Sequence, residues 1–228
     1  GFIQVGEGFS RINLKLKSID GTEINGQGPN IGDRAITELF EKLDCLQNGD
    51  ILVLAGSIPN TLPEDIYESI MERLQTKGVR IVVDATKDLL LNVLKYHPFL
   101  IKPNNHELGE MFGVTLKTDE EIITYAKKLQ EKGAGNVLIS MAGDGAILIT
   151  EDGEIHKGLP PKGEVVNSVG AGDSMVAGFL TGYLNTGDYE KAFKLGIATG
   201  SATAFLAWLA EKEDVVKLLD EAKENFGL

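Results

Sequence analysis

The chain has 228 residues, a length that suits one α/β domain or two small ones. It contains 34 acidic and 22 basic side chains, a net charge of −12, and no Lys/Arg run longer than Lys127-Lys128, which argues against nucleic acid and anionic membrane surfaces as partners. Glycine is abundant, 27 residues against only 7 prolines, so turns, helix caps and ligand-facing loops are expected. A small anionic ligand stays possible, because backbone amides can bind it.

Cysteine and histidine usage excludes some classes of site. Cys45 is the only cysteine, so neither an internal disulfide nor a cysteine zinc site can form, and a reducing cytoplasm is expected. His97, His106 and His156 are far apart and predict no metal cluster. No apolar run reaches the roughly 18 residues that a membrane span needs, and Gly1–Arg11 has no signal-peptide pattern.

A β-hairpin is predicted near the N-terminus. In Arg11–Ser18, apolar Ile12, Leu14 and Leu16 alternate with polar residues, as in a half-buried strand. Asp20-Gly21 indicates a turn, and Thr22–Ile24 forms the returning strand.

From residue 32 onward, helical and strand patterns alternate. Helices are predicted over 33–43, 62–77, 89–94, 118–132, 172–184, 189–210 and 214–226, and strands over 51–54, 80–84, 99–101, 136–140 and 146–150, with short extended pieces at 154–157 and 164–167. This order predicts a mainly parallel sheet with helices on both faces, and ligands at the carboxyl ends of its strands. We expect residues 1–30 to contribute a small β lid and 31–228 to form the α/β domain.

The segment Asn167–Ser174 is the first of three that indicate chemistry. Gly170-Ala171-Gly172 precedes an amphipathic helix, so its backbone N–H groups would form an anion hole at the helix N-terminus. Asp173 would face whatever these amides bind. The alternative is an N-capping aspartate after a glycine turn.

Two further segments follow predicted strands. Lys102-Pro103-Asn104-Asn105-His106-Glu107 could face phosphate and a divalent metal together, or be a solvated loop before a helix. Ser140–Gly145 could contact a nucleotide, or be only a hairpin turn. A Walker-A loop is excluded, because the sequence contains no Gly-Lys dipeptide.

Together these segments resemble the ribokinase-like, PfkB-type sugar kinases over essentially the whole chain. Asn167–Leu180 is similar to that family's C-terminal signature, Lys102–Glu107 to its K-P-N-x-x-E element, and Ser140–Gly145 to its S-x-G-x-x-G loop with one residue of altered spacing. Arg11–Lys15 and Thr22–Pro29 resemble the hairpin of the phosphosugar kinases. The resemblance is stronger to the kinases that act on fructose 1-phosphate than to those that act on tagatose 6-phosphate.

The resemblance implies a three-layer α/β/α fold and ATP-dependent phosphorylation of a phosphosugar. The first expectation is fructose 1-phosphate to fructose 1,6-bisphosphate, with tagatose 6-phosphate as the alternative. ATP and Mg²⁺ are the implied cofactors, the cytoplasm is the implied location, and a homodimer formed through the lid hairpin is the implied assembly.

The resemblance also implies roles for individual residues. Asp173 would be the catalytic base and would contact the sugar, with the amides of Gly170, Ala171 and Gly172 stabilising the transferred phosphoryl group. Arg11 and Ser57 would bind the phosphosugar. The implied ATP contacts are Lys102, Asn104, Ser140, Gly143, Gly145 and Gly172. Glu107 would hold Mg²⁺ through water.

The sequence departs from the family pattern in two places. The family's first strands, a sugar-binding Asp and a Gly-Gly-Lys-Gly-x-Asn element have no counterpart here, so we expect a fold incomplete at its N-terminus. Leu206-Ala207-Trp208 replace a stretch that is usually small and polar. The alternative function is therefore a catalytically weak fragment that only binds nucleotide.

Overall fold

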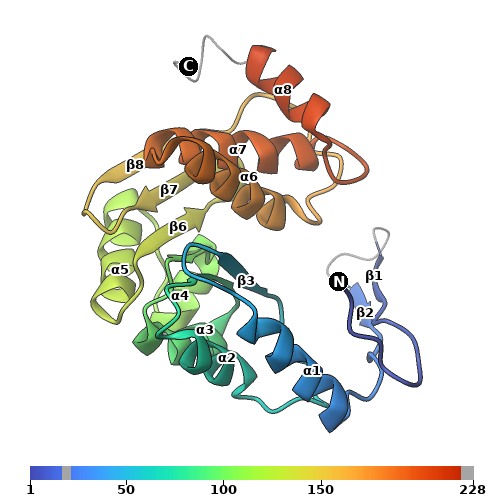
Figure 1. The fold of residues 1–228 in the computed structure, drawn as a ribbon. Coiled ribbons are helices and arrows are strands. Elements are labelled where there is room, and N and C mark those ends of the chain that lie inside the picture. Colours follow the sequence, from blue (N-terminus) through green and yellow to red (C-terminus); the bar gives the residue numbers. More distant parts are fainter. Residues whose placement is uncertain (17–21, 222–228) are drawn as a thin grey trace. The chain divides into compact units, whose positions relative to one another are not determined.

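A computed structural model describes residues 1–16 and 22–221 of the chain (Figure 1). The chain folds into two compact units, Gly1–Ile81 and Val82–Leu228. Among the described residues, no helix combines the length and the apolar character needed to cross a bilayer.

The first unit begins with the predicted hairpin. Strand β1 (Asn13–Leu16) pairs antiparallel with β2 (Thr22–Asn25), with Leu14 opposite Ile24. The prediction of a hairpin is therefore confirmed, while its turn at Asp20-Gly21 lies outside the described residues. Ile12, Leu14 and Ile24 are all exposed, so this apolar surface is uncovered within the unit.

Helix α1 (Asp33–Asp44), strand β3 (Ile51–Ala55) and helix α2 (Ile66–Leu74) complete the first unit. The prediction that α2 starts at Leu62 is wrong by four residues. Leu62 precedes Pro63, whose ring disfavours helical backbone at the preceding residue. The Pro63 carbonyl instead accepts a hydrogen bond from the Ile66 amide at 3.1 Å, in the turn that leads into the helix.

Five strands of the sheet in the second unit lie side by side in the order β4-β5-β6-β7-β8. β4, β5 and β6 run parallel, as the sequence predicts for the main part of the sheet. β6, β7 and β8 are antiparallel neighbours and form a meander. The extended piece expected at 164–167 forms no strand, because the amides of Val166 and Asn167 both donate to the Ala204 carbonyl. The strands are Arg80–Asp84, Leu100–Ile101, Asn136–Ser140, Ala146–Ile149 and Ile155–Gly158.

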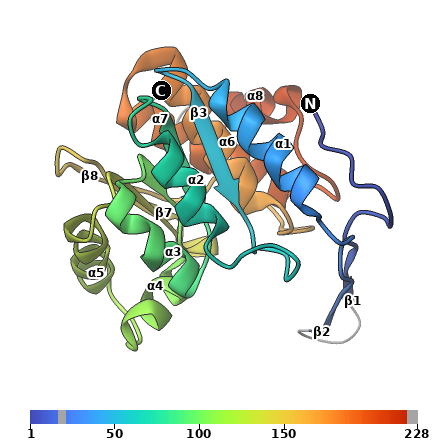
Figure 2. The ribbon, with the colours of Figure 1, turned by 60° about the horizontal axis from the view of Figure 1, so that its bottom comes forward.

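Helices cover both faces of this sheet. α3 (Lys87–Val93), α4 (Asn105–Phe112) and α5 (Asp119–Glu131) lie on one face, and α6 (Ala171–Thr186) and α7 (Tyr189–Ala204) on the other (Figures 1 and 2). α8 (Lys212–Glu221) packs against α7, and single 3₁₀ turns occupy Leu94–Tyr96 and Ala142–Asp144. The core between the layers includes the fully buried strand residues Val137, Ile139, Ile147 and Leu148.

Helix α7 ends six residues before the predicted Ala210. The Thr203 hydroxyl accepts a hydrogen bond from the Ala210 amide at 3.1 Å, and Asn167 donates its side-chain amide to the Ala207 carbonyl at 3.1 Å. The segment after α7 therefore forms a loop that is bonded to the loop before α6.

Glycines allow α6 and α7 to pack closely. A Cβ atom on Gly182 would lie 2.6 Å from the Ala192 Cα, and one on Gly178 would lie 2.7 Å from the Leu195 carbonyl oxygen. From the α7 side, a Cβ on Gly200 would lie 3.0 Å from the Ala171 carbonyl oxygen. Because these neighbours are backbone atoms, a side chain at any of these glycines would force the two helices apart and disturb the N-terminus of α6.

We predict that Gly182→Ala destabilises the protein by about 1–3 kcal/mol, the usual cost of overpacking. At a solvent-exposed helix position the same substitution would stabilise the protein, because Ala is preferred over Gly by up to about 1 kcal/mol. The matched control is Asn185→Ala, at an exposed α6 position. Urea unfolding of both variants measures the difference, and a Gly182→Ala protein as stable as the control would contradict the close packing.

Candidate functional site

The carboxyl ends of three parallel strands meet at one edge of the sheet in the second unit. Val83 pairs with Ile101 across β4 and β5, and Ile101 pairs with Val137 across β5 and β6. Asp84, Lys102 and Ser140 consequently follow or end these strands at the same edge. Ligands of parallel α/β sheets bind at this edge.

Lys102 is the buried charge of the site. Only 7% of the residue is exposed, and its ammonium nitrogen lies 3.2 Å from Oδ1 of Asp84. Lys102 was predicted from its motif, whereas Asp84 was not singled out. The one signal for Asp84 in the sequence is a carboxylate directly after the buried run Ile81-Val82-Val83.

The N-terminus of α6 lies against this lysine. Its cap, Gly170, has a φ of +81°, a conformation that favours glycine. A Cβ on Gly172 would lie 3.1 Å from the Lys102 nitrogen, so the ammonium group touches the first turn of the helix. The structure therefore places Lys102, a predicted site residue, against the helix turn that contains Gly172 and Asp173.

The backbone amides at this terminus differ in availability. The Ala171 amide donates to the Ser168 carbonyl at 3.2 Å, which contradicts the expectation that it is open to a ligand. Among the hydrogen bonds of residues 1–16 and 22–221, none is donated by the amides of Gly172 and Asp173. These two amides, at the positive end of the helix dipole, can bind an anion.

Charges converge on Asp84. Burial raises the pKa of its carboxyl group, the Lys102 ammonium opposes this shift, and the negative charges of Asp173 and Glu107 raise the pKa further. The carboxylates of Asp173 and Glu107 are thus close enough to Asp84 to interact with it electrostatically. An anionic ligand here needs additional positive charge, as a divalent cation would supply.

Asn104 and Glu107 form a capping box at the start of α4. The Glu107 amide donates to Oδ1 of Asn104 at 2.8 Å, and the Asn104 amide donates to Oε2 of Glu107 at 2.8 Å. Glu107 is therefore an acidic residue that caps the start of a helix. The expected contacts of Asn104 with ATP and of Glu107 with Mg²⁺ stay predictions. The side-chain atoms outside the capping box would make these contacts.

The segment Ser140–Gly145 is a tight turn between β6 and β7. Gly145 has a φ of +91°, and a Cβ there would collide with the Gly158 carbonyl, so packing alone explains this glycine. A Cβ on Gly143 would meet nothing within 4 Å, which leaves space beside the turn. Ser140 bridges to Asn104 at the sheet edge. Nucleotide contacts of these residues stay predictions.

Arg11 and Ser57 belong to the first unit. Arg11 donates from Nη2 to Oδ1 of Asn25 at 2.5 Å, across the hairpin. Ser57 is exposed and follows Gly56, whose φ is +83°, at the end of β3. Their binding of a phosphosugar stays a prediction.

The donor set suits magnesium better than a metal that needs an all-protein cage. Within the described part of the chain, no three His, Cys, Asp or Glu side chains form a cluster able to hold a metal. Mg²⁺ usually keeps several waters and binds one or two carboxylates together with substrate phosphates. Glu107, with one carboxylate oxygen outside the capping box, fits that role.

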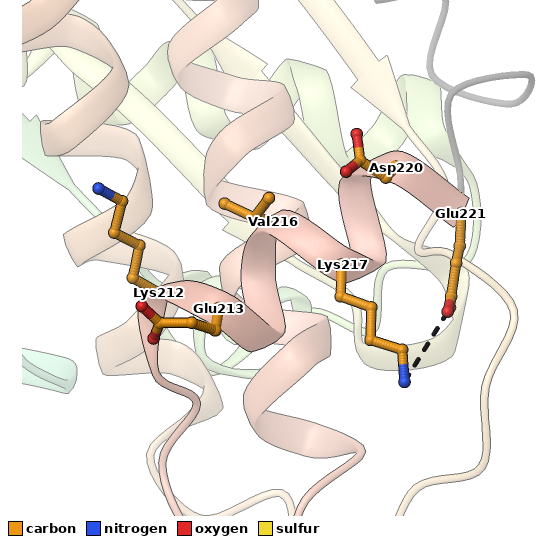
Figure 3. A pocket seen from close by; sticks show the side chains of 6 residues that line it. All are labelled: Lys212, Glu213, Val216, Lys217, Asp220 and Glu221. Carbon is orange, nitrogen blue, oxygen red and sulfur yellow. Dashed lines mark ion pairs between the residues drawn. The ribbon is translucent and has the colours of Figure 1, made fainter.

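A hollow on the outer side of α8 is a poor candidate for the site. Its lining comes from one helix, includes charges of both signs, and contains the Lys217–Glu221 ion pair at 3.9 Å (Figure 3). The lining residues are Lys212, Glu213, Val216, Lys217, Asp220 and Glu221. None of them was predicted as a site residue.

Known proteins resemble the chain over nearly its whole length. The family model described as pfkB family carbohydrate kinase matches residues 2–219. A 1-phosphofructokinase of Bacillus subtilis is 52% identical over 217 residues, 95% of this chain and 71% of the relative. A D-tagatose-1-phosphate kinase of Bacillus licheniformis is 36% identical over 224 residues, 98% of this chain and 72% of the relative.

Solved structures agree in fold. The crystal structure of a Staphylococcus aureus protein, provisionally described as a phosphofructokinase, superposes with a TM-score of 0.84 at 43% identity, over 95% of this chain and 70% of that chain. Phosphofructokinase-2 of Escherichia coli in complex with fructose-6-phosphate gives a TM-score of 0.80 at 23% identity, over 92% of this chain and 69% of that chain, a likeness of fold alone.

Proposed function

The chain belongs to the pfkB family of carbohydrate kinases, and from this premise we propose that it transfers the γ-phosphoryl group of ATP to fructose 1-phosphate, giving fructose 1,6-bisphosphate. The observation that supports phosphoryl transfer best is the contact of the buried Lys102 ammonium with the first turn of α6, which also contains Asp173. The identity of 52% with a 1-phosphofructokinase favours this sugar.

Electrostatic stabilisation is the main task of the α6 N-terminus. The amides of Gly172 and Asp173 and the ammonium of Lys102 would bind the transferring phosphoryl group, whose negative charge is spread over its oxygens. When bound, Mg²⁺ supplies further neutralisation of the phosphates, and Glu107 would hold it through water.

Asp173 has the position of a general base. Its side chain is exposed in the first turn of α6, and no hydrogen bond within the described residues occupies its carboxylate. The carboxylate would accept the proton of the sugar hydroxyl as that oxygen attacks the γ-phosphorus. Asp173 therefore has both the chemistry and the exposure that the proposed role requires.

Arg11 and Ser57 of the first unit are proposed ligands of the phosphosugar. Arg11 would bind the phosphate already on the sugar through its planar guanidinium group, and Ser57 would contact the sugar. ATP and phosphosugars are cytoplasmic metabolites, so the proposed location is the cytoplasm.

A second candidate substrate is D-tagatose 1-phosphate. The relative that is 36% identical over 98% of this chain has that substrate in its name, whereas tagatose 6-phosphate, the alternative expected from the sequence, appears in neither of the relatives described above. A coupled assay of ADP release decides among the three phosphosugars. The protein should give its highest kcat/KM with fructose 1-phosphate, and a preference for either tagatose phosphate would contradict the proposal.

We predict that Asp173→Asn lowers kcat by about 10²- to 10⁴-fold, the usual loss when a general base is removed. ATP binding should persist, because the amides and Lys102 are unchanged. Asp152→Asn, at an exposed turn, is the matched control and should keep its activity. An Asp173→Asn enzyme with half of the original kcat would refute the base assignment.

Arg11→Ala should raise the KM for the phosphosugar by about 10- to 150-fold, the factor that a charge-assisted hydrogen bond contributes. The KM for ATP should change little, since Arg11 would contact only the sugar phosphate. Arg34→Ala removes an exposed arginine from α1 of the same unit and is the control. Equal increases of both KM values would show that Arg11 is not the phosphate ligand.

A homodimer through the hairpin is the proposed assembly, because an isolated two-stranded hairpin is only marginally stable and the apolar Ile12, Leu14 and Ile24 are exposed. Leu14→Lys should convert a dimer into a monomer in sedimentation experiments. Asn13→Lys, on the alternate side of β1, should leave the dimer intact. A wild-type protein that sediments as a monomer at high concentration would exclude this assembly.

A further inference from the structure

We propose that Asp84 is a positioning residue for phosphoryl transfer, whose carboxylate holds the Lys102 ammonium against the first turn of α6. This inference rests on the proposed function, because it gives Lys102 a phosphate to bind. No motif of the sequence pointed to Asp84.

The strand register places the two residues together. Val82 pairs with Leu100 and Val83 with Ile101 in the parallel ladder of β4 and β5, and the Lys102 amide donates to the Val83 carbonyl at 3.3 Å. Asp84 and Lys102 are the next residues along these strands. Their side chains meet at 3.2 Å, with 19% of the Asp84 side chain and 9% of the Lys102 side chain exposed.

Burial restricts the rotamers of the Lys102 side chain. A lysine in water samples many rotamers, but a buried ammonium group must remain close to a carboxylate that compensates its charge. Asp84 is the acidic partner found for Lys102 in the described part of the chain. An ammonium group has three donors, so the bond to Asp84 leaves donors for another acceptor.

The Lys102 side chain points toward the N-terminus of α6, as its contact with Gly172 shows. The Lys102 nitrogen lies 3.1 Å and its Cε 3.4 Å from the position of a Cβ on Gly172. The ammonium group is therefore held between Asp84 and the helix turn whose amides at Gly172 and Asp173 are available. A phosphate bound by those amides would be within reach of the remaining ammonium donors.

The charge of Asp84 argues against a direct role in binding phosphate. A carboxylate repels phosphate oxygens, and Asp84 already experiences the negative charges of Asp173 and Glu107. Its contribution is therefore the orientation of Lys102. The effect of Lys102 on phosphate binding should then depend on the presence of Asp84.

A double-mutant cycle on nucleotide affinity tests this dependence. Calorimetry with ATP and Mg²⁺ measures the Kd of the wild type, Asp84→Asn, Lys102→Met and the double variant. Lys102→Met should weaken binding by about 10- to 150-fold in the wild-type background. In the Asp84→Asn background the same change should cost about threefold or less, because the lysine is no longer held in place.

A steady-state assay adds a second readout. Asp84→Asn should lower kcat by about tenfold or more without changing the Mg²⁺ concentration that gives half-maximal rate. Asp88→Asn, an exposed acid on α3 in the same unit, is the matched control and should match the wild type in both measurements. Thermal unfolding verifies that each variant is folded. If Asp84→Asn does not fold, Asp84→Glu, which retains the charge but displaces the ammonium group, replaces it in both experiments.

Three results would overturn the inference. The first is an equal loss of ATP affinity on Lys102→Met in both backgrounds, and the second is a Lys102→Met variant with an unchanged Kd for ATP. The third is an Asp84→Asn variant in which only the Mg²⁺ dependence changes and kcat does not, which would make Asp84 a metal ligand. Failure of the proposed function is distinguishable, because a wild type that binds ATP but does not phosphorylate fructose 1-phosphate contradicts only the substrate assignment. A wild type without measurable affinity for ATP would contradict both.

Discussion

The ion pair between Lys102 and Asp84 is the interaction on which the site depends. Removing an ammonium group from water costs several kcal/mol, and a buried carboxylate compensates that cost only at short range. At 3.2 Å, the pair joins the ends of β4 and β5. The contact of Lys102 with Gly172 then extends the constraint to α6. The buried ammonium group of Lys102 thus contacts the end of β4 and the start of α6 from its own position at the end of β5.

The packing of the second unit keeps these parts in register. α6 packs closely against α7, because Gly178, Gly182 and Gly200 place no side chain between the facing backbones. On the opposite face of the sheet, the capping box of Asn104 and Glu107 fixes the start of α4 directly after Lys102 and Pro103. The groups that would bind phosphate are therefore located by regular structure and not by a mobile loop.

The sequence indicated most of this arrangement, and its failures have physical causes. Lys102 and Asp173 were found because each lies in an extended motif, whereas Asp84 is a single acid after a common apolar strand. Asn104 and Glu107 were ambiguous, since the residue types that bind phosphate and metal also cap helices. The end of α7 was missed because Thr203 and Asn167 bond to the segment 205–210, a tertiary interaction that helical periodicity does not encode.

The most direct test of the central claim is a crystal structure of the protein with Mg²⁺ and a non-hydrolysable ATP analogue. We expect a phosphate oxygen of the analogue to accept hydrogen bonds from the Lys102 ammonium and from the amides of Gly172 or Asp173, with the Lys102–Asp84 pair intact. A nucleotide whose phosphates bind away from the first turn of α6, or a Lys102 side chain that leaves Asp84 and does not contact phosphate, would contradict it.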